Sequence, residues 1–205
     1  MSPGRLEAFS DGVFAIAITL LVLDIHVPDP STTADLAQQL GSQWPSYVAY
    51  GVSFLTIGII WINHHAMLRR IKAIDHEILI LNLLLLLCVG LLPFTTALMA
   101  AYLKESEGET LAAAIYAGSF LLMSVVFAAM NWTILFRKDH LLAGPIDAAT
   151  RRTIITRGVA GLLPYLAAAI LAVLSPYVSL AICGAVAALY ALPLASGDEE
   201  TAAPA

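Results

Sequence analysis

The stretch R-L-E-A-F-S-D-G-V-F-A-I-A-I-T-L-L-V-L-D-I, residues 5–25, decides the interpretation of the whole chain. Only residues 12–23 within it carry no charge. As a helix those residues are about 18 Å long, whereas the hydrocarbon core of a bilayer is about 30 Å thick. Charged side chains stand at both ends: Arg5, Glu7, Asp11 and Asp24. Because charges facing lipid are costly, the stretch predicts a membrane helix that is enclosed by other helices or lines water.

The composition of the chain is that of a membrane protein. Of its 205 residues, 60% are hydrophobic and only 12% are charged, whereas soluble domains carry roughly 25% charged residues. Residues 78–103 and 111–136 contain no charged side chain at all. Each run is long enough to cross a bilayer with some tilt. These runs exclude a soluble helical bundle.

Six hydrophobic segments predict an all-α membrane protein with six transmembrane helices in a single domain, residues 1–195. The predicted spans are residues 5–26, 44–69, 75–102, 110–136, 150–174 and 176–194. Pro93 and Pro164 lie inside the third and fifth spans, and each is expected to kink its helix. Residues 196–205 are expected to form a short acidic cytoplasmic tail.

The basic residues predict the orientation of the spans. Nine of the ten lysines and arginines fall on one side if six spans alternate, which places both termini in the cytoplasm. Lys104 is alone on the other side among aspartates and glutamates. An acidic outer mouth, including Asp24, raises the local concentration of cations. A plain shortage of basic residues in the outer loops explains the same pattern equally well.

One face of the first predicted helix carries a stripe of mostly apolar residues. At helical spacing the stripe contains Arg5, Phe9, Gly12, Ile16, Thr19 or Leu20, and Leu23. Its Ile16–Leu20–Leu23 part is a candidate hydrophobic constriction of the kind that gates by dewetting. Ordinary packing between helices is the alternative reading of the same stripe.

Polar residues in the second and third spans are candidate partners for the charged end of the first helix. Asp11 has a short side chain and needs a partner, whereas Arg5 and Glu7 can reach the headgroups. The candidates are Trp61, His64, His65 and Asn82. Adjacent histidines diverge by about 100° on a helix, which favours hydrogen bonding to the first helix or an interfacial position over a metal site.

The sequence carries no constellation typical of an enzyme. It contains no G-x-S-x-G, H-E-x-x-H or P-loop motif. The two cysteines, Cys88 and Cys183, stand alone in apolar runs and predict neither a disulfide nor a metal site. No cofactor and no nucleic-acid partner are expected, since the basic residues line one membrane face.

The motif R-x-x-x-F-S-D, formed by Arg5, Phe9, Ser10 and Asp11 and followed by G-V-F-A-I-A-I-T-L-L-V-L, resembles the first-helix signature of the transmembrane protein 175 family. The stretch W-x-x-H-H, residues 61–65, and Asn82 agree with this resemblance. Members of the family are potassium channels, endolysosomal in animals and shorter in prokaryotes. A chain with one six-span unit resembles the prokaryotic form, which implies a homotetramer in the plasma membrane.

The resemblance also implies roles for individual residues. The first helices would line a central pore, with the constriction at Ile16 followed by Leu20 and Leu23, and with Thr19 as a possible selectivity layer. The helix would be anchored by Arg5, Phe9, Ser10 and Asp11 through polar contacts with Trp61, His64, His65 and Asn82. The sequence lacks the T-V-G-Y-G filter of ordinary potassium channels. The resemblance implies potassium and other monovalent cations as the permeant species, and the missing filter predicts only modest selectivity for potassium over sodium.

Two other functions remain open from the sequence. A proton- or cation-coupled carrier could use Asp11 together with His64 or His65 as a relay, because ionisable groups inside membranes often serve this purpose. Carriers usually have interrupted spans with binding groups at mid-depth, whereas the first span here is apolar at its centre. The other alternative is a structural or assembly protein that transports nothing.

Overall fold

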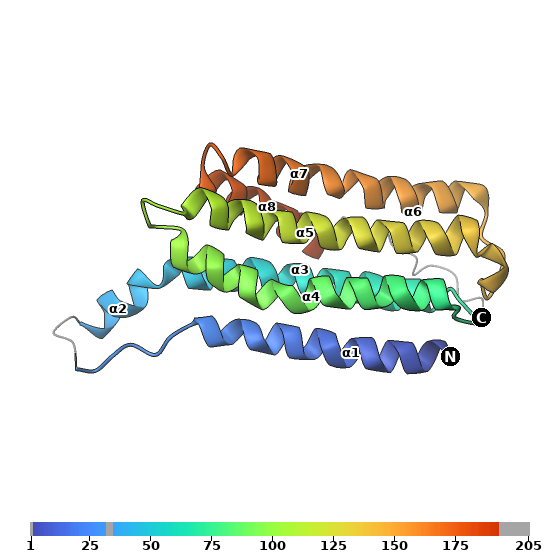
Figure 1. Ribbon diagram of the computed structural model, residues 1–205, viewed down its shortest axis with the longest axis horizontal. Helices are drawn as coiled ribbons and strands as arrows, with labels where there is room; N and C mark the ends of the chain where they lie inside the picture. The colour runs from blue at the N-terminus through green and yellow to red at the C-terminus, as the bar shows by residue number, and fades with distance from the viewer. Residues whose placement is uncertain (1, 32–34, 193–205) are drawn as a thin grey trace, which may run out of the picture.

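The computed structural model describes residues 2–31 and 35–192, and the predicted acidic tail at residues 196–205 lies outside them. The described chain is helical throughout, as Figure 1 shows. In chain order its elements are α1 (Pro3–Leu20), η1 (Leu21–Asp24), α2 (Leu36–Ser42), α3 (Trp44–Leu68), α4 (His76–Tyr102), α5 (Glu109–Trp132), η2 (Thr133–Arg137), η3 (Asp139–Leu141), α6 (Ala148–Ala160), α7 (Leu162–Leu171) and α8 (Pro176–Ala191).

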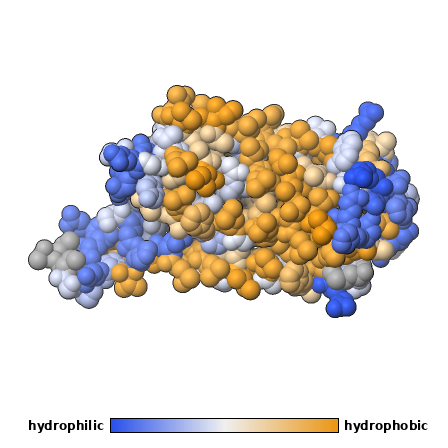
Figure 2. Space-filling view, viewed as in Figure 1, coloured by the Kyte–Doolittle hydropathy of each residue, from blue (hydrophilic) through white to orange (hydrophobic). Residues whose placement is uncertain are grey.

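Long apolar helices dominate the described part of the chain. Five of them are long and apolar enough to cross a membrane: Pro3–Asp24, Trp44–Leu68, His76–Tyr102, Glu109–Arg137 and Ala148–Leu171. The shorter apolar helix is α8. Figure 2 shows the result on one face of the molecule, where apolar side chains cover the middle and polar side chains lie towards the two ends. The chain is therefore a multi-pass integral membrane protein.

The helices run side by side as a bundle. In Figure 1, α1 forms one edge, α6 and α7 form the opposite edge, and α3, α4 and α5 lie between them. Helix α1 contacts α3 and α4, while α5 packs against α4, α7 and α8. The core that holds these helices together is mostly apolar and includes Tyr116, Phe120 and Met123 of α5, which are fully buried. Polar side chains, among them His64 and Asn82, are buried as well.

The two prolines inside predicted spans behave differently. Pro164 has no N–H to bond the carbonyl of Ala160, four residues earlier. Helix α6 ends at that residue, and α7 begins after a turn at Gly161, so the fifth span is broken there. Pro93, by contrast, lies inside α4, which continues as one helix from His76 to Tyr102.

Helix α2 is an element that the sequence did not predict. It is only seven residues long and buries none of its residues, so the sequence has no hydrophobic periodicity that would predict it. The chain beside it is fastened by Gln43, which follows α2. The Gln43 side chain accepts a hydrogen bond from the backbone N–H of His26 (3.0 Å) and donates one to its carbonyl (2.9 Å).

A short connection between α4 and α5 depends on a glycine. Gly108 has φ +86°, and a Cβ added there would lie 2.9 Å from the Tyr102 ring. We expect Gly108→Ala to lower the free energy of unfolding by about 1–2 kcal/mol, because an L side chain at positive φ is strained. Thermal melting of the purified protein in detergent measures the change. Gly118→Ala, where a Cβ meets nothing within 4 Å, is the matched control and should not lower the melting temperature. Equal melting temperatures for both variants would contradict the prediction.

Candidate pore-lining helix and its anchoring network

Helix α1 has two distinct faces. Five residues at helical spacing are buried against the bundle: Leu6, Ser10, Phe14, Ala17 and, in η1, Leu21. The other face carries the predicted stripe, and its side chains are exposed: Phe9 at 55%, Ile16 at 61%, Leu20 at 43% and Leu23 at 68%. The stripe is therefore not packed within this chain, which leaves an apolar surface along one edge of the bundle.

Thr19 contributes a polar atom to the exposed stripe. Its hydroxyl donates to carbonyl oxygens of its own helix, those of Ile16 (2.9 Å) and Ala15 (3.0 Å). This bond holds the side chain in one rotamer and leaves the oxygen lone pairs free to accept. Thr19 can therefore present an oxygen on the same face as Ile16 and Leu20.

The buried face of α1 is joined to α3 and α4 by a chain of hydrogen bonds. The Asn82 amide nitrogen donates to the Ser10 hydroxyl (3.1 Å), which itself donates to the carbonyl of Leu6 (2.8 Å). The Asn82 amide oxygen lies 2.7 Å from Nε2 of His64. Because Asn82 uses its nitrogen for Ser10, its oxygen must accept, so His64 carries its proton on Nε2. Ser10, His64 and Asn82 are all completely buried.

Two further polar contacts lie towards the surface of the same helix pair. The indole Nε1–H of Trp61 donates to the Asp11 carboxylate at 2.8 Å. Nδ1 of His65 lies 2.5 Å from the Glu7 carboxylate, a contact that is an ion pair when the imidazole is protonated. Each contact joins α1 to α3. The charged end of α1 is thus fastened at three levels: Glu7, Ser10 and Asp11.

The structure brings together most of the residues that the sequence singled out, but the pairing differs in detail. Ser10, Asp11, Trp61, His64, His65 and Asn82 all make contacts between α1, α3 and α4. Glu7, which the sequence assigned to the headgroups, pairs with His65 instead, because both residues lie where α1 faces α3. Arg5 and Phe9 lie on the exposed face, and the Arg5 side chain makes no hydrogen bond or ion pair among the described residues. Their anchoring role stays a prediction.

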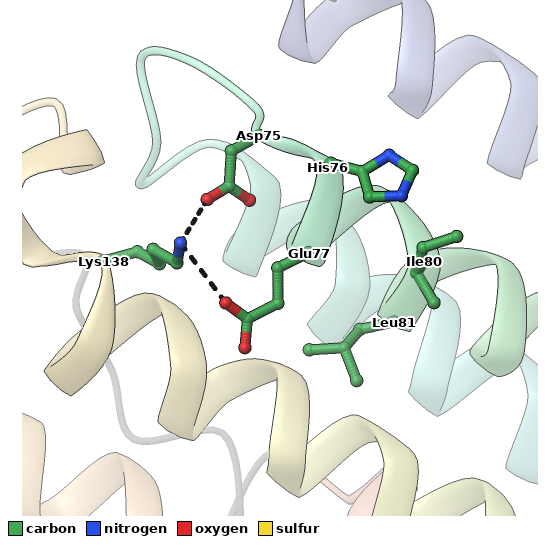
Figure 3. A pocket seen from close by; sticks show the side chains of 6 residues that line it. All are labelled: Asp75, His76, Glu77, Ile80, Leu81 and Lys138. Atoms are coloured by element: carbon green, nitrogen blue, oxygen red, sulfur yellow. Dashed lines mark ion pairs between the residues drawn. The ribbon is translucent and has the colours of Figure 1, made fainter.

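A second polar cluster joins the acidic start of α4 to the basic residues at the end of η2, the segment that follows α5, as Figure 3 shows. Lys138 lies between Asp75 (2.6 Å) and Glu77 (3.2 Å), and Arg137 also pairs with Glu77. Asp75 accepts the backbone N–H of Ile78 at 3.0 Å and so caps α4. That backbone hydrogen bond, followed by Lys138, lowers the pKa of Asp75. The hydrogen bond to Asp75, followed by that to Glu77, raises the pKa of Lys138.

The loops beside this cluster also pair with each other. The backbone N–H of Lys72 donates to the carbonyl of Leu141 (2.9 Å), and that of Ala143 donates to Arg70 (2.8 Å). These bonds flank an antiparallel bridge between Ile71 and Leu142, both buried. The charges that line the open pocket of Figure 3 are paired with one another. The cluster therefore positions α4 and α5 within the bundle.

The fold and the site thus define an all-helical membrane protein whose first helix is joined to its neighbours by polar bonds and exposes an apolar stripe. A sequence profile described as "Endosomal/lysosomal potassium channel TMEM175" matches residues 5–93. A potassium channel of Streptomyces collinus is 45% identical over 187 residues, which covers 91% of this chain and 90% of the relative. The chain therefore belongs to the TMEM175 family, a family of ion channels and not of enzymes.

Two further similarities extend the comparison. The crystal structure of a lysosomal potassium-selective channel TMEM175 homolog from Chamaesiphon minutus superposes with a TM-score of 0.83. It is 38% identical, with 96% of this chain and 98% of that chain covered. The endosomal/lysosomal proton channel TMEM175 of mouse is 38% identical over 117 residues, which is 53% of this chain but only 23% of the mouse protein.

The buried hydrogen-bond chain predicts a specific loss of stability. Asn82→Leu removes the amide that bonds both Ser10 and His64, so each of these buried polar side chains loses one hydrogen bond. We expect the free energy of unfolding to fall by about 1–3 kcal/mol, the cost of a buried unsatisfied group. Thermal melting in detergent measures this change.

Asn63→Leu is the matched control for this variant. Asn63 is exposed on α3 and donates only to a carbonyl of its own helix, that of Ile59. The same substitution there should leave the melting temperature close to that of the wild type. If Asn82→Leu melts no lower than Asn63→Leu, the buried chain does not fasten α1.

Proposed function

We propose that this protein is a passive potassium channel in which α1 from four copies of the chain lines a central pore. The observation that carries the proposal is the exposed stripe of α1, with Ile16 and Leu23 each more than half exposed. Buried polar bonds on the opposite face hold the helix in this rotation. The names of the relatives, potassium channels of bacteria, support potassium as the permeant ion.

The proposed pore follows from the position of α1 in the subunit. Helix α1 lies at one edge of the bundle in Figure 1, and copies arranged around an axis along that edge would enclose its stripe. Ile16, Leu20 and Leu23 then form successive apolar rings at the constriction. Thr19 supplies an oxygen between them, and Asp24 at the end of η1 supplies negative charge at the outer mouth.

The proposed topology has six spans with both termini in the cytoplasm of a prokaryotic cell. Helix α8 is the sixth span, although at 16 residues it is about 24 Å long. The basic residues gather at the end of the bundle where α1 begins and α6 begins. The bias of lysine and arginine towards the cytoplasm supports that orientation.

The polar contacts of α1 do not favour the carrier alternative. A relay through Asp11 needs one of the span-two histidines as its partner. Asp11 instead accepts from Trp61, while His65 pairs with Glu7 and His64 with Asn82. These bonds hold the helix in place, which is what a pore-lining element requires.

Ile16→Asn tests the placement of the constriction. A polar ring at this position removes the apolar barrier to hydrated ions, so we expect single-channel conductance to rise several-fold and potassium selectivity to fall. Planar bilayer recordings of the reconstituted protein measure both quantities.

Ile170→Asn is the matched control for this recording. Ile170 of α7 is 61% exposed, as is Ile16, but it lies on the edge of the subunit opposite α1. Its substitution should leave conductance unchanged. If Ile16→Asn behaves like Ile170→Asn, then Ile16 does not line the constriction and the proposed pore is wrong.

The absence of carbonyl ligands at the proposed constriction predicts weak selectivity. Ile16, Leu20 and Leu23 provide no oxygen atoms to replace the hydration shell of potassium, so discrimination rests on pore diameter, partial dehydration and Thr19. We expect reversal potentials in proteoliposomes to show a modest preference for potassium over sodium. Discrimination as strict as that of a T-V-G-Y-G filter would disprove this mechanism, and Thr19→Ala should weaken the preference further.

A further inference from the structure

Helix α6 is exposed in a way that sets it apart from the rest of the bundle. None of its residues, all of which the structure describes, is buried. In the span formed by α6 and α7, only 11% of the most apolar stretch is buried, whereas the corresponding share in the other long spans is 28% to 44%. In Figure 1, α6 lies on the edge of the subunit opposite α1, so this surface and the proposed pore are separate.

The reason for this exposure is the short length of α8. Helix α8 packs against α3, α5 and α7 and ends at Ala191. Near its end, the Tyr190 hydroxyl lies so close to Gly161 that a Cβ there would be 3.0 Å away. Helix α8 thus ends level with the joint between α6 and α7. Helix α8 packs against one side of α7. Beyond the joint, no described helix covers the continuation of that side along α6.

The exposed face of α6 changes from polar to apolar along its length. At helical spacing it carries Arg152 and Thr156, then Val159 and Leu163, and all four side chains are exposed. On a helical wheel Thr153 and Thr156 lie between Arg152 and Arg157. The face therefore has two guanidinium groups and two hydroxyls at one end and an apolar strip above them.

The two arginines on this face are not engaged within the described part of the chain. The guanidinium groups of Arg152 and Arg157 make no hydrogen bond or ion pair there. Their neighbour Arg151 contrasts with them, because its guanidinium donates to the carbonyls of Leu135 (2.5 Å) and Ile146 (3.1 Å). The Arg151 side chain stabilises the fold, whereas the guanidinium groups of Arg152 and Arg157 are available to bind an external group.

The depth of this face places the arginines at the membrane surface. Residues 158–174, which follow Arg157, carry no charged side chain. As a helix these 17 residues are about 26 Å long at ~1.5 Å per residue, which is close to the thickness of the hydrocarbon core, about 30 Å. Arg152 and Arg157 precede this uncharged run and therefore lie at the level of the headgroups, at the basic end of the bundle. Val159 and Leu163 lie deeper, beside the acyl chains.

We propose that the exposed face of α6 is a binding site for an anionic phospholipid. The phosphate accepts hydrogen bonds from Arg152 and Arg157, the hydroxyls of Thr153 and Thr156 contact the headgroup, and an acyl chain lies along Val159 and Leu163. Guanidinium groups match phosphate oxygens in charge and geometry. The face carries no carboxylate to receive the amine of a zwitterionic headgroup, which favours a lipid with net negative charge.

Native mass spectrometry of the full chain tests the proposal, with phosphatidylglycerol and phosphatidylcholine of identical acyl chains as probes. The wild type should retain phosphatidylglycerol in preference. Arg152→Gln with Arg157→Gln should weaken its binding about thirtyfold, given the usual attraction of two basic residues to an anionic surface. The matched control is Arg69→Gln with Lys72→Gln, which removes the same charge from exposed residues at the same end and should keep the preference.

Further variants separate folding and competing occupants from loss of the site. If the double variant does not fold, Arg152→Gln and Arg157→Gln alone should each weaken binding about fivefold. Equal loss in the α6 variant and in the control, or no preference in the wild type, would overturn the proposal. The proposal would also be overturned if the preference for phosphatidylglycerol appeared only after the acidic chain end is neutralised by Asp198→Asn, Glu199→Gln and Glu200→Gln. The acidic chain end, and not a lipid, would then occupy the face of α6 in the wild type. Potassium flux is a separate readout, so failure here leaves the proposed channel function untouched.

Discussion

The buried amide of Asn82 is the contact on which the arrangement of the first helix depends. It donates to Ser10 of α1 and accepts from His64 of α3, so one side chain of α4 joins three helices. In a membrane the hydrophobic effect does little to hold helices together, and polar bonds and close packing set their rotation. Because Ser10 must face Asn82, the opposite side of α1 must face away from the bundle.

The rotation of α1 has a direct consequence for the charged ends of the short apolar stretch. Asp11 and Glu7 would be costly in lipid, and each instead meets a partner on α3, Trp61 and His65 respectively. The twelve apolar residues between the charges need not match the thickness of the bilayer if copies of the chain enclose them. Anchoring and the proposed constriction are thus two faces of a single helix.

Part of this architecture could be predicted from the sequence because it depends on hydrophobic run length. The helices α3, α4 and α5 lie where uncharged runs placed them, within a residue or two at most ends. Polar side chains are rare inside spans, so the sequence could single out residues that the structure brings into contact: Ser10, Asp11, Trp61, His64, His65 and Asn82. Arg5 and Phe9, which belong to the same predicted set, lie on the exposed face, and the anchoring role of the set stays a prediction. Helix α2 could not be predicted, because a seven-residue helix without a buried face leaves no periodic signal. The same applies to the bridge between Ile71 and Leu142, which joins loops far apart in sequence.

The sequence by itself determined that the chain is an all-helical membrane protein and which of its residues are polar inside the spans, because these depend on local composition. It predicted a kink at both Pro93 and Pro164, whereas α4 continues through Pro93 and the fifth span is interrupted ahead of Pro164. Only the tertiary structure decided which polar residues pair. Asp11 meets Trp61 rather than a histidine, and Glu7 meets His65 rather than the headgroups. Only the tertiary structure also shows that α8 ends beside Gly161 and leaves α6 uncovered, because that depends on how distant helices lie against each other.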